Sequence, residues 1–443
     1  YRPGAFFLCL FRDKAKGRRK NKRGASASRW QFYDKIELPG LKKTSMVVMA
    51  MAKKSVRDVE VKGKRILVRV DFNVPLERGE VKDDTRIRAA LPTIRYLLER
   101  GARIILISHL GRPKGEVKAD LRLDPVGRRL AALLNQPVKK LDQAVGDTVT
   151  SAVAALKEGE IILLENIRFE KGEEKNDPAL SQQLARLADL YVNDAFGTAH
   201  RAHASTAGVA AHIPAVAGLL MIKEIETLSR CIDNPGRPLV VILGGAKVSD
   251  KINVIRRFLQ LADRLLIGGG MANTFLAARG CSMGDSLVET ERIAEARQLM
   301  EESKLNRCEI MLPEDLVVTR EIKEESPFNI VSGGAVEEGW KAVDLGPETA
   351  SRYSRAVAEA KMVVWNGPLG VCEVPPFDRG TEIVARAVAQ SEAFSVVGGG
   401  DIVAALESLG LTDKINFIST GGGATLEFWE GKELPGIAVL QDK

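Results

Sequence analysis

The residues best suited to do chemistry lie near the midpoint of the chain, in the stretch 239–251, LVVILGGAKVSDK. Its five leading apolar residues are typical of a buried parallel strand, and Gly244 and Gly245 form a turn that exposes backbone N–H groups ahead of a helix. Such a joint suits an anion. Lys247 and Lys251 share one helical face if the helix has begun by Lys247, and a bound phosphate would relieve their conflict with the helix dipole. The stretch alone fits equally well a tight turn with two solvated lysines.

Polar side chains follow four expected strands in the first half of the chain. The strands cover residues 65–70, 103–108, 161–165 and 189–193 and alternate with helical stretches, which is the pattern of a parallel α/β sheet. Ligands of such sheets bind outside the carboxyl ends of the strands. Three of the four histidines of the chain fall at these ends. One rim would therefore collect Asp71, Asn73, His109, Arg112, Arg168, His200, Arg201 and His203.

Together these rim residues predict an anion pocket, although a lone histidine or arginine usually has an ordinary structural explanation. Histidines and arginines without a cluster of cysteines or carboxylates suit an anionic oxygen ligand better than a transition metal. Arg86 adds to them, because it lies in the first turn of a helix that Asp84 or Thr85 opens, where a cation is misplaced unless an anion shares the site. A small phosphorylated carboxylate would be held by several charge-assisted hydrogen bonds of roughly 1.5–3 kcal/mol each.

Glycines follow five expected strands in the second half, at 244–245, 268–270, 366–373, 398–401 and 421–423. A rim of glycines lets a flat base and a polyphosphate approach the backbone closely. Asp401 ends one of these turns, where it either binds Mg²⁺ held by nucleotide phosphates or caps a helix, and its position leaves both alternatives open. The sequence contains neither GxxxxGKS nor GxxxxGKT, and no kinase HRD or DFG. A nucleotide would therefore bind here through a type of site that uses none of these motifs.

Positive charge is concentrated at the amino-terminal end. The 443 residues carry a net charge of +7, but residues 1–50 hold thirteen Lys or Arg against three Asp or Glu, so the rest of the chain is slightly acidic at −3. Because residues 51–443 are slightly acidic, their composition gives no reason to expect nucleic acid as a partner. The five cysteines are scattered without a CxxC pair, which favours the reducing cytoplasm and argues against a zinc site or a disulfide framework. The longest apolar runs have the length of strands, not of membrane spans.

Residues 1–50 are expected to be a disordered basic extension without a role. Periodic hydrophobic patterning starts near Met51, and Met-Ala-Lys-Lys there is similar to an ordinary amino terminus, so translated upstream sequence or an expression remnant is the favoured interpretation. A targeting peptide is the alternative, since the segment is rich in arginine and poor in acids. A further alternative is recruitment of nucleic acid through the basic run 14–23, with nearby aromatic residues stacking on bases.

Eight ordered motifs resemble the phosphoglycerate kinase family, over a match from about Lys53 to Leu440. They are VDFNVP at 70–75, DTRI at 84–87, SHLGRP at 108–113, ENIRF at 165–169, NDAFGTAHRAHAS at 193–205, GGAKVSDK at 244–251, WNGP at 365–368 and STGGGA at 419–424. The resemblance implies reversible phosphoryl transfer between 1,3-bisphosphoglycerate and ADP, giving 3-phosphoglycerate and ATP. It implies an α/β fold with two Rossmann-like domains, each a doubly wound parallel sheet. The parts would be a 3-phosphoglycerate domain at 51–220, a hinge helix at 221–234, a nucleotide domain at 235–420 and a returning segment at 421–443.

The resemblance also assigns roles to single residues. For 3-phosphoglycerate it implies Asp71, Asn73, Arg86, His109, Arg112, Arg168 and Arg201. For the nucleotide it implies Gly245, Lys247, Lys251, Gly269, Gly346, Asn366, Pro368, Gly370, Val371, Glu373, Gly399, Gly400 and Asp401, with Asp401 serving Mg²⁺. Since two strongly anionic partners must meet, we expect Arg86 and Lys251 to neutralise and align the transferred group. Lys247, Mg²⁺ and the N–H groups near Gly422 and Gly423 would assist them.

Three residues depart from the family pattern: Ile402 replaces a usual Ser or Thr, Cys372 a common Phe, and Ile222 a usual acidic residue. None removes an essential cation, so activity is expected, with altered nucleotide affinity. The alternative is a catalytically silent nucleotide- or anion-binding module. Two cationic half-sites that meet across a hinge argue against it, because a binding module does not need them. A dinucleotide-dependent dehydrogenase is disfavoured, because no GxGxxG follows the opening strand. We expect a monomer, with neither a membrane nor a nucleic acid as partner.

Overall fold

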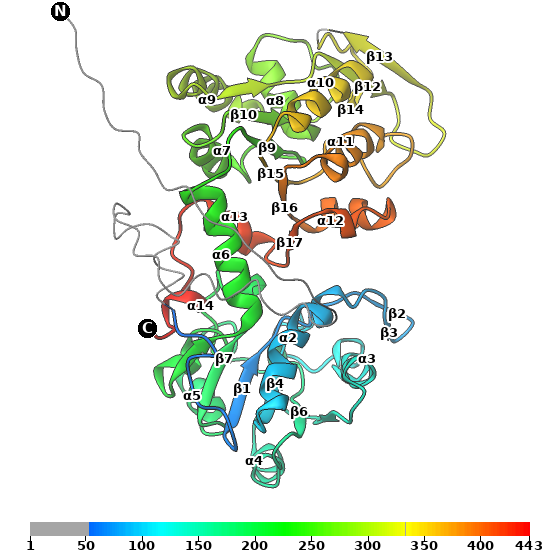
Figure 1. Cartoon of the computed structure of the whole chain (residues 1–443). Helices are drawn as coiled ribbons and strands as arrows, with labels where there is room; N and C mark the ends of the chain where they lie inside the picture. Colours follow the sequence, from blue (N-terminus) through cyan, green and yellow to red (C-terminus); the bar gives the residue numbers. More distant parts are fainter. Residues whose placement is uncertain (1–52, 333) are drawn as a thin grey trace, which may run out of the picture. The chain divides into compact units, whose positions relative to one another are not determined.

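The computed structural model describes residues 53–332 and 334–443, so the expected disorder of residues 1–50 lies outside the described part. Each half of the described chain is built on a six-stranded parallel sheet with helices packed on it (Figure 1). The central strands of both sheets are buried on both faces, which is why the sequence shows them as continuous apolar runs. The expected α/β class with two Rossmann-like units is confirmed.

The first sheet has the strand order β5-β6-β4-β1-β7-β8, with every pairing parallel. At its centre, Ile66 pairs in register with Ile104 on one side and Leu190 on the other. All four expected strands are present, and two short edge strands add to them. The strands are β1 (Arg65–Arg69), β4 (Arg103–Ile107), β5 (Lys139–Lys140), β6 (Ile161–Leu163), β7 (Leu190–Asn193) and β8 (Ala215–Ala217).

Helix α2 (Thr85–Glu99) begins where the sequence predicted, but by a different contact. Asp84 occupies the N-cap position without a capping bond from its side chain, and its carboxylate instead accepts from Arg88 (2.7 Å). Asp83 fixes the start, because one of its carboxylate oxygens accepts from both the backbone N–H (2.8 Å) and the hydroxyl (2.6 Å) of Thr85. The rest of this half comprises the hairpin β2 (Leu76–Glu77) and β3 (Glu80–Val81) and helices α3 (Asp124–Leu134), α4 (Asp147–Ala154) and α5 (Pro178–Ala185).

The second sheet has the order β11-β10-β9-β15-β16-β17, again all parallel. Its strands are β9 (Leu239–Leu243), β10 (Arg264–Ile267), β11 (Glu309–Met311), β15 (Met362–Asn366), β16 (Phe394–Gly398) and β17 (Phe417–Ser419). Its helices are α7 (Ile252–Leu259), α8 (Gly269–Ala278), α9 (Ile293–Asn306), α10 (Pro347–Ala358), α11 (Arg379–Gln390), α12 (Gly400–Ser408) and α13 (Gly423–Trp429).

An additional antiparallel sheet of order β13-β12-β14 belongs to the second half and was not anticipated from the sequence. It consists of β12 (Asp315–Thr319), β13 (Phe328–Ser332) and β14 (Lys341–Leu345). Its edge strand β13 is largely exposed, whereas β12 is buried along its whole length. The chain passes from β14 into α10 through Gly346, the N-cap residue of that helix.

Helix α6 (Leu219–Asp233) occupies the stretch expected as a hinge helix at 221–234. Its first turn is fixed by Asp194, whose carboxylate accepts from the N–H groups of Leu220 (2.9 Å) and Met221 (3.2 Å). One turn further, fully buried Glu224 accepts from the N–H (2.6 Å) and hydroxyl (2.8 Å) of Thr420 and from the hydroxyl of Ser419 (2.8 Å). These bonds tie α6 to the turn that follows β17.

Replacing Glu224 by Gln is expected to change how stability depends on pH. Burial raises the pKa of Glu224 to about 7, so between its ordinary value of 4.5 and 7 the folded protein binds more protons than the unfolded chain. The free energy of unfolding of the parent therefore falls as pH rises through this window, by roughly 3 kcal/mol from this group alone. In the Gln variant, the free energy of unfolding does not decrease by this amount, because the amide does not titrate. Denaturant unfolding at both ends of the window measures the difference, and parallel pH dependence in the two proteins would contradict the prediction.

The last residues of the chain pack on the first sheet. In α14 (Pro435–Ala438), Gly436 donates its N–H to Ala199 (2.8 Å) and accepts from the side chain of Asn193 (2.9 Å). Gln441 then donates to the carbonyl of Ala215 in β8 (2.9 Å). The sequence predicted such a return for residues 421–443, and the contacts described here belong to the last part of that segment.

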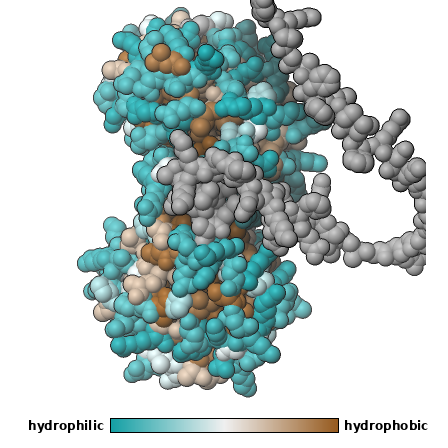
Figure 2. All heavy atoms as spheres, turned by 60° about the vertical axis from the view of Figure 1, so that its left-hand side comes forward, coloured by the Kyte–Doolittle hydropathy of each residue, from teal (hydrophilic) through white to brown (hydrophobic). Residues whose placement is uncertain are grey.

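Most of the surface drawn in Figure 2 is hydrophilic, as expected when the large apolar side chains fill the interiors around the two sheets. The largest fully buried side chains include Trp365 and Trp429. In the described part of the chain, no helix is both long enough and apolar enough to cross a membrane.

Candidate active site

The first sheet brings Asp71, Asn73, Arg86 and His109 together at the carboxyl ends of its central strands. Asp71 follows β1, and its carboxylate pairs with the guanidinium of Arg86 (2.8 Å) and lies 3.8 Å from Nδ1 of His109. Asn73 accepts the N–H of Gly111 (2.9 Å), which ties the end of β1 to the loop after β4. The convergence predicted from the strand ends is therefore present in the structure.

Arg168 is placed by a short 3-10 helix, Ile167–Phe169, that Asn166 caps through a side-chain bond to the N–H of Arg168 (3.1 Å). Its guanidinium is buried, donates to the carbonyl of Gly111 (2.7 Å) and lies 3.2 Å from a carboxylate oxygen of Glu174. Burial lowers its pKa from the ordinary value. This arginine is thus aimed at the same loop that Asn73 holds.

Arg201 and His200 form a further part of the rim, since Nε of Arg201 donates to Nε2 of His200 (3.0 Å). Burial, followed by the charge of Arg201, lowers the pKa of His200 to about 4. His203 lies instead beside the buried carboxylate of Glu173, 3.7 Å from Nδ1. Arg112 is exposed, and within the described residues it makes no hydrogen bond or ion pair. The structure therefore places Arg112 at the surface and His203 against Glu173.

The electrostatics of this rim favour an anion. His109 is almost completely buried, and its pKa lies well below the ordinary value because of burial and then the charges of Arg69, Arg168, Arg201 and Arg86. Among the residues implied for 3-phosphoglycerate, Asp71 alone carries a negative charge. Asp71 and Glu174 each pair with one of the guanidiniums, and the positive charge that remains at the rim suits an anionic ligand better than a cation.

The glycine joints of the second sheet interlock through their backbones. Gly245 donates its N–H to Pro368 (2.9 Å), and Gly269 donates to Leu369 (2.8 Å). A Cβ atom on Gly244 would lie 1.9 Å from the carbonyl oxygen of Pro368, so no other residue fits there without movement. The turns after β9, β10 and β15 therefore form one packed surface of backbone.

Lys251 is the buried cation of this surface. Its ammonium donates to the carbonyl oxygens of Gly244 and Asn366, the latter at 3.1 Å, and its residue is only 8% exposed. Burial lowers the pKa of Lys251 to about 8, while the carboxylates of Asp250 and Asp401 oppose that shift. Such a lysine can turn from neutral carbonyls to an incoming phosphate.

The helix after β9 starts later than the sequence suggested. Lys251 is the N-cap of α7, so the helix has not begun by Lys247, and the two lysines do not share a helical face. The cause lies far along the chain, because Glu289 accepts from both the N–H (3.0 Å) and the hydroxyl (2.6 Å) of Ser249 and holds this segment as a turn. Lys247 is exposed, while Lys251 is buried.

Asp401 is not the cap of its helix. Gly399 occupies the N-cap position of α12, and Asp401 is the second helical residue, exposed in the first turn. No group of three or more metal-ligating side chains exists among residues 53–332 and 334–443. A lone carboxylate fits a Mg²⁺ ion that phosphates and water largely coordinate, because magnesium in nucleotide sites takes one or two carboxylates.

Other residues implied for the nucleotide border the same joints. The side chain of Asn366 donates to the carbonyl of Gly398 (2.6 Å), which links the turns after β15 and β16. Gly346 and Gly370 are packed against buried carboxylates, since a Cβ on either would lie 2.1–2.2 Å from an atom of Asp315 or Asp344. Glu373 is exposed, and Val371 donates its N–H to Val343. Tight packing thus accounts for these two glycines without a ligand.

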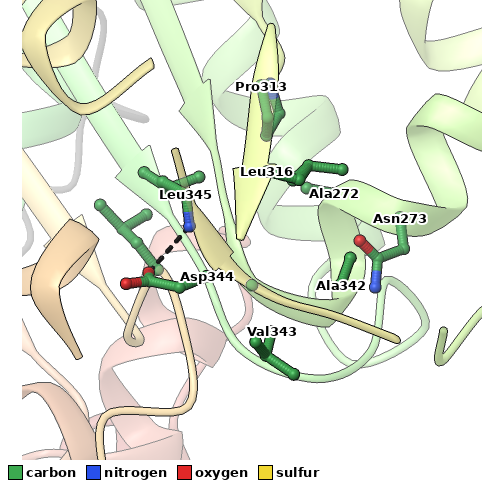
Figure 3. A pocket seen from close by; sticks show the side chains of 10 residues that line it. Ala272, Asn273, Pro313, Leu316, Ala342, Val343, Asp344 and Leu345 are labelled. Carbon is green, nitrogen blue, oxygen red and sulfur yellow. Dashed lines mark hydrogen bonds between the residues drawn. The ribbon is translucent and has the colours of Figure 1, made fainter. Parts of the chain in front are cut away.

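Two cavities border these groups. A small pocket beside the turn at Gly269 is drawn in Figure 3, where apolar side chains such as Leu316 and Val343 and the amide of Asn273 point toward the same space. The dashed line there marks the bond from the N–H of Leu345 to Asp344 (2.8 Å). A larger cavity is lined by residues of both rims, among them Asn73, Arg86, Gly399, Gly400 and Gly422.

Comparison with known proteins agrees with this geometry. A family model described as phosphoglycerate kinase matches residues 56–432. The chain belongs to the phosphoglycerate kinase family. The phosphoglycerate kinase of Moorella thermoacetica is 59% identical over 393 residues, covering 89% of this chain and 100% of the relative, and that of Dictyoglomus turgidum is 56% identical over 397 residues, covering 89% and 100%.

Solved phosphoglycerate kinases share the fold. The structure from Coxiella burnetii matches with a TM-score of 0.78 at 43% identity, and that from Pyrococcus horikoshii with 0.78 at 35%, each covering 87% of this chain and 98% of its own. As a phosphoglycerate kinase, the enzyme transfers a phosphoryl group reversibly between 1,3-bisphosphoglycerate and ADP, giving 3-phosphoglycerate and ATP. None of these comparisons supports the catalytically silent alternative.

The three departures from the phosphoglycerate kinase pattern lie in different surroundings. Ile402 is fully buried in the apolar core beside the second sheet, where a hydroxyl would face hydrocarbon. Cys372 is half-buried in the loop after β15, and burial, followed by the charge of Glu373, raises its pKa to about 11. Ile222 is half-buried in α6 and packs against the core. Since the side chain of Ile402 packs inward, it contributes to the packing of the apolar core.

Arg69 and Glu173 are two site residues that the sequence did not single out. Arg69 is the last residue of β1 and only 1% exposed, and its guanidinium reaches His109. A charged residue inside the buried run RILVRV was the available signal, because a fully buried arginine needs partners. Glu173 gave no such signal in the charged stretch 170–177.

Proposed function

We propose that the rim of the first sheet binds 3-phosphoglycerate or 1,3-bisphosphoglycerate, and that the glycine joints of the second sheet bind ADP or ATP. The observation that carries the first assignment is the group of guanidiniums around His109 with Asp71 as the single carboxylate among the proposed ligands. Several charge-assisted bonds from fixed donors suit a phosphate and a carboxylate on one small molecule. The proposed ligands are Asp71, Asn73, Arg86, His109, Arg112, Arg168 and Arg201.

The nucleotide assignment rests on the packed backbone of the joints and on Lys251. Exposed backbone at helix starts suits phosphates, and the larger cavity, which residues of both rims line, has room for a nucleotide. We assign to this half Gly245, Lys247, Lys251, Gly269, Gly346, Asn366, Pro368, Gly370, Val371, Glu373, Gly399, Gly400 and Asp401. Asp401 would serve Mg²⁺, which neutralises phosphate charge when it is bound with the nucleotide.

In this mechanism the protein aligns and neutralises, with little covalent chemistry of its own. Arg86 stabilises the transferred phosphoryl group from the first half, and Lys251 does so from the second. Backbone N–H groups at Gly422 and Gly423, where α13 begins, and the ammonium of Lys247 add further donors. Closure of the two halves excludes water, so that these charges act in a less polarisable surrounding.

We further propose the division into parts at 51–220, 221–234, 235–420 and 421–443, with α6 as the hinge. The contacts of Glu224 with the turn after β17 support α6 as the hinge, because they connect this helix to a strand of the second sheet, which we assign to the nucleotide. We infer a monomer in the cytoplasm. Both half-sites come from one chain, and scattered cysteines without a CxxC pair suit a reducing compartment.

Replacing Arg168 by Met should separate the two half-sites in a binding experiment. The affinity for 3-phosphoglycerate is expected to fall about ten- to a hundredfold, because one or two charge-assisted bonds disappear, while MgADP affinity stays within about twofold. Isothermal titration with each ligand measures both. Arg95→Met is the matched control, since Arg95 is exposed and donates to the carbonyl of Leu133 (3.1 Å). Unchanged 3-phosphoglycerate affinity in the Arg168 variant would overturn the assignment.

The affinity for ADP is expected to weaken as pH rises above about 8. Below that pH, Lys251 is charged both free and bound, so its titration has no effect. Above it, the free ammonium loses its proton, and a bound phosphate must restore that proton by raising the pKa of Lys251. Titration at pH 8.5 in two buffers of different ionisation enthalpy should show proton uptake in the parent and not in Lys251→Met. Equal uptake in both proteins would contradict the role of Lys251.

A further inference from the structure

A buried chain of polar contacts runs behind the proposed substrate rim. Glu173 is fully buried and accepts from the hydroxyl (2.6 Å) and the N–H (2.9 Å) of Ser205. The same hydroxyl oxygen accepts from Nε of Arg69 (2.9 Å). The guanidinium of Arg69 then donates to the carbonyl of Val70 and, through Nη2, to Nδ1 of His109 (3.3 Å). No part of the assigned substrate set includes Glu173, Ser205 or Arg69.

The contact between Arg69 and His109 determines which ring nitrogen carries the proton. A guanidinium only donates hydrogen bonds and stays charged at any pH a protein tolerates. Nδ1 of His109 must therefore accept, which requires an unprotonated Nδ1 and puts the proton of the neutral ring on Nε2. The carboxylate of Asp71 lies 3.8 Å from Nδ1, too far to compete as an acceptor.

We propose that Arg69 is a positioning residue of this kinase: it holds His109 neutral, with its proton on Nε2, so that the ring donates Nε2–H to an oxygen of the bound phosphoglycerate. This inference rests on the proposed role of His109 in substrate binding. Arg69 acts through His109, and its own guanidinium is occupied by Ser205, Val70 and the imidazole.

The charges that face His109 explain why a neutral donor serves here. Arg69 from β1, Arg86 from α2, and Arg168 and Arg201 from the other rim segments face the ring, against the single carboxylate of Asp71. A further positive charge among four guanidiniums would be costly, and burial lowers the pKa of His109 in the same direction. A ring that is neutral throughout the physiological range presents the same donor at every pH at which the enzyme works.

The Glu173–Ser205 pair fixes Arg69 in this orientation. Arg69 is 1% exposed, so its charge needs compensation inside the protein, and Glu173 supplies it at the far side of the Ser205 hydroxyl. Tyr191 adds a bond from its hydroxyl to the carbonyl of Ser205 (2.8 Å). A planar guanidinium can reach the hydroxyl, the carbonyl and the imidazole together, whereas the single ammonium of a lysine cannot span all three.

The direct test is the tautomer of His109 in the full chain without ligands. Nitrogen NMR of protein labelled with ¹⁵N in its histidines distinguishes the two neutral tautomers and the imidazolium, and the His109 signals are identified by their loss in His109→Gln. We expect the Nε2–H tautomer at pH 7, unchanged down to a pH at which an exposed histidine has titrated. An Nδ1–H tautomer, or an imidazolium at pH 7, would overturn the proposal without the use of any Arg69 variant.

The second arm is Arg69→Lys, with Arg65→Lys as a control on the same strand, where Arg65 pairs at the surface with Asp189 (2.6 Å). In Arg69→Lys we expect a share of the Nδ1–H tautomer and a KM for 3-phosphoglycerate raised about tenfold, with kcat within about twofold. The control should change none of these. A normal tautomer and KM in Arg69→Lys would refute the role of Arg69. If His109→Gln binds 3-phosphoglycerate normally, the substrate role of His109 fails instead, whatever the tautomer.

Discussion

Replacing Lys251 by Met is expected to lower kcat about a thousandfold at saturating substrates. The ammonium is held by two backbone carbonyls on the packed glycine surface, and within residues 53–332 and 334–443 it makes no ion pair that Met would break. Its loss removes a charge that acts on the transferred phosphoryl group in a water-excluded site, where one preorganised donor contributes roughly a hundred- to a thousandfold. Steady-state production of ADP from MgATP that depends on 3-phosphoglycerate measures kcat.

Lys53→Met is the matched control for this prediction. Lys53 is also nearly buried, and its ammonium donates to the carbonyl of Leu440 (2.8 Å) and pairs with Asp442 (2.9 Å), far from the glycine joints in sequence and contacts. Its kcat should stay within about twofold of the parent once thermal melting shows that the variant is folded. A loss of less than tenfold in Lys251→Met, or an equal loss in Lys53→Met, would show that Lys251 has no special part in the chemistry.

Replacing Arg86 by Met is expected to lower kcat by at least a hundredfold, with a smaller effect on 3-phosphoglycerate affinity. Arg86 lies in the first turn of α2, where there is no acidic residue, and among the described residues it pairs with Asp71 alone, at 2.8 Å. A guanidinium in that place can leave Asp71 for the equatorial oxygens of the transferred group, where its charge matters most in the transition state. Rate measurements at saturating substrates, together with titration of 3-phosphoglycerate, separate the two effects.

Arg88→Met provides the control on the same helix. Arg88 is two residues further along α2, and its half-exposed side chain pairs with Asp84 at 2.7 Å. Pairs of this kind contribute little to stability, so both kcat and KM should remain within about twofold. Equal losses in the two variants would mean that Arg86 acts through the stability of α2, and the catalytic role assigned to it would be withdrawn.

The residues of the first rim could be predicted because each lies close in sequence to the end of a strand. Asp71, His109 and Arg168 each lie within four residues of the end of an apolar run, and parallel strands bring their carboxyl ends to one edge whatever the order of the strands. The structure places all three together with Arg86, as the alternation of strands and helices indicated. The glycine joints followed from the same rule, although the packing of Gly346 and Gly370 on buried carboxylates could not be read from the sequence.

The features that the sequence did not reveal depend on contacts between distant residues. Helix α7 starts late because Ser249 is held by Glu289, forty residues further on. Arg69 reaches His109 only because Ser205 and Glu173 fix its guanidinium from another part of the chain. A local pattern contains neither partner, so the sequence could not decide whether the helix had begun by Lys247, and the contact of the strand residue Arg69 with His109 was not predicted.

The measurement that most directly tests whether cations from both halves act on one phosphoryl group is a double-mutant cycle on the chemical step. Single-turnover transfer from MgATP to 3-phosphoglycerate would be timed in the parent, Arg86→Met, Lys251→Met and the double variant, with every enzyme saturated. We predict that the double variant loses at least tenfold less than the product of the two single losses, because either loss alone already spoils the alignment that the other charge needs. Losses that simply multiply would show that Arg86 and Lys251 act independently and would contradict the mechanism.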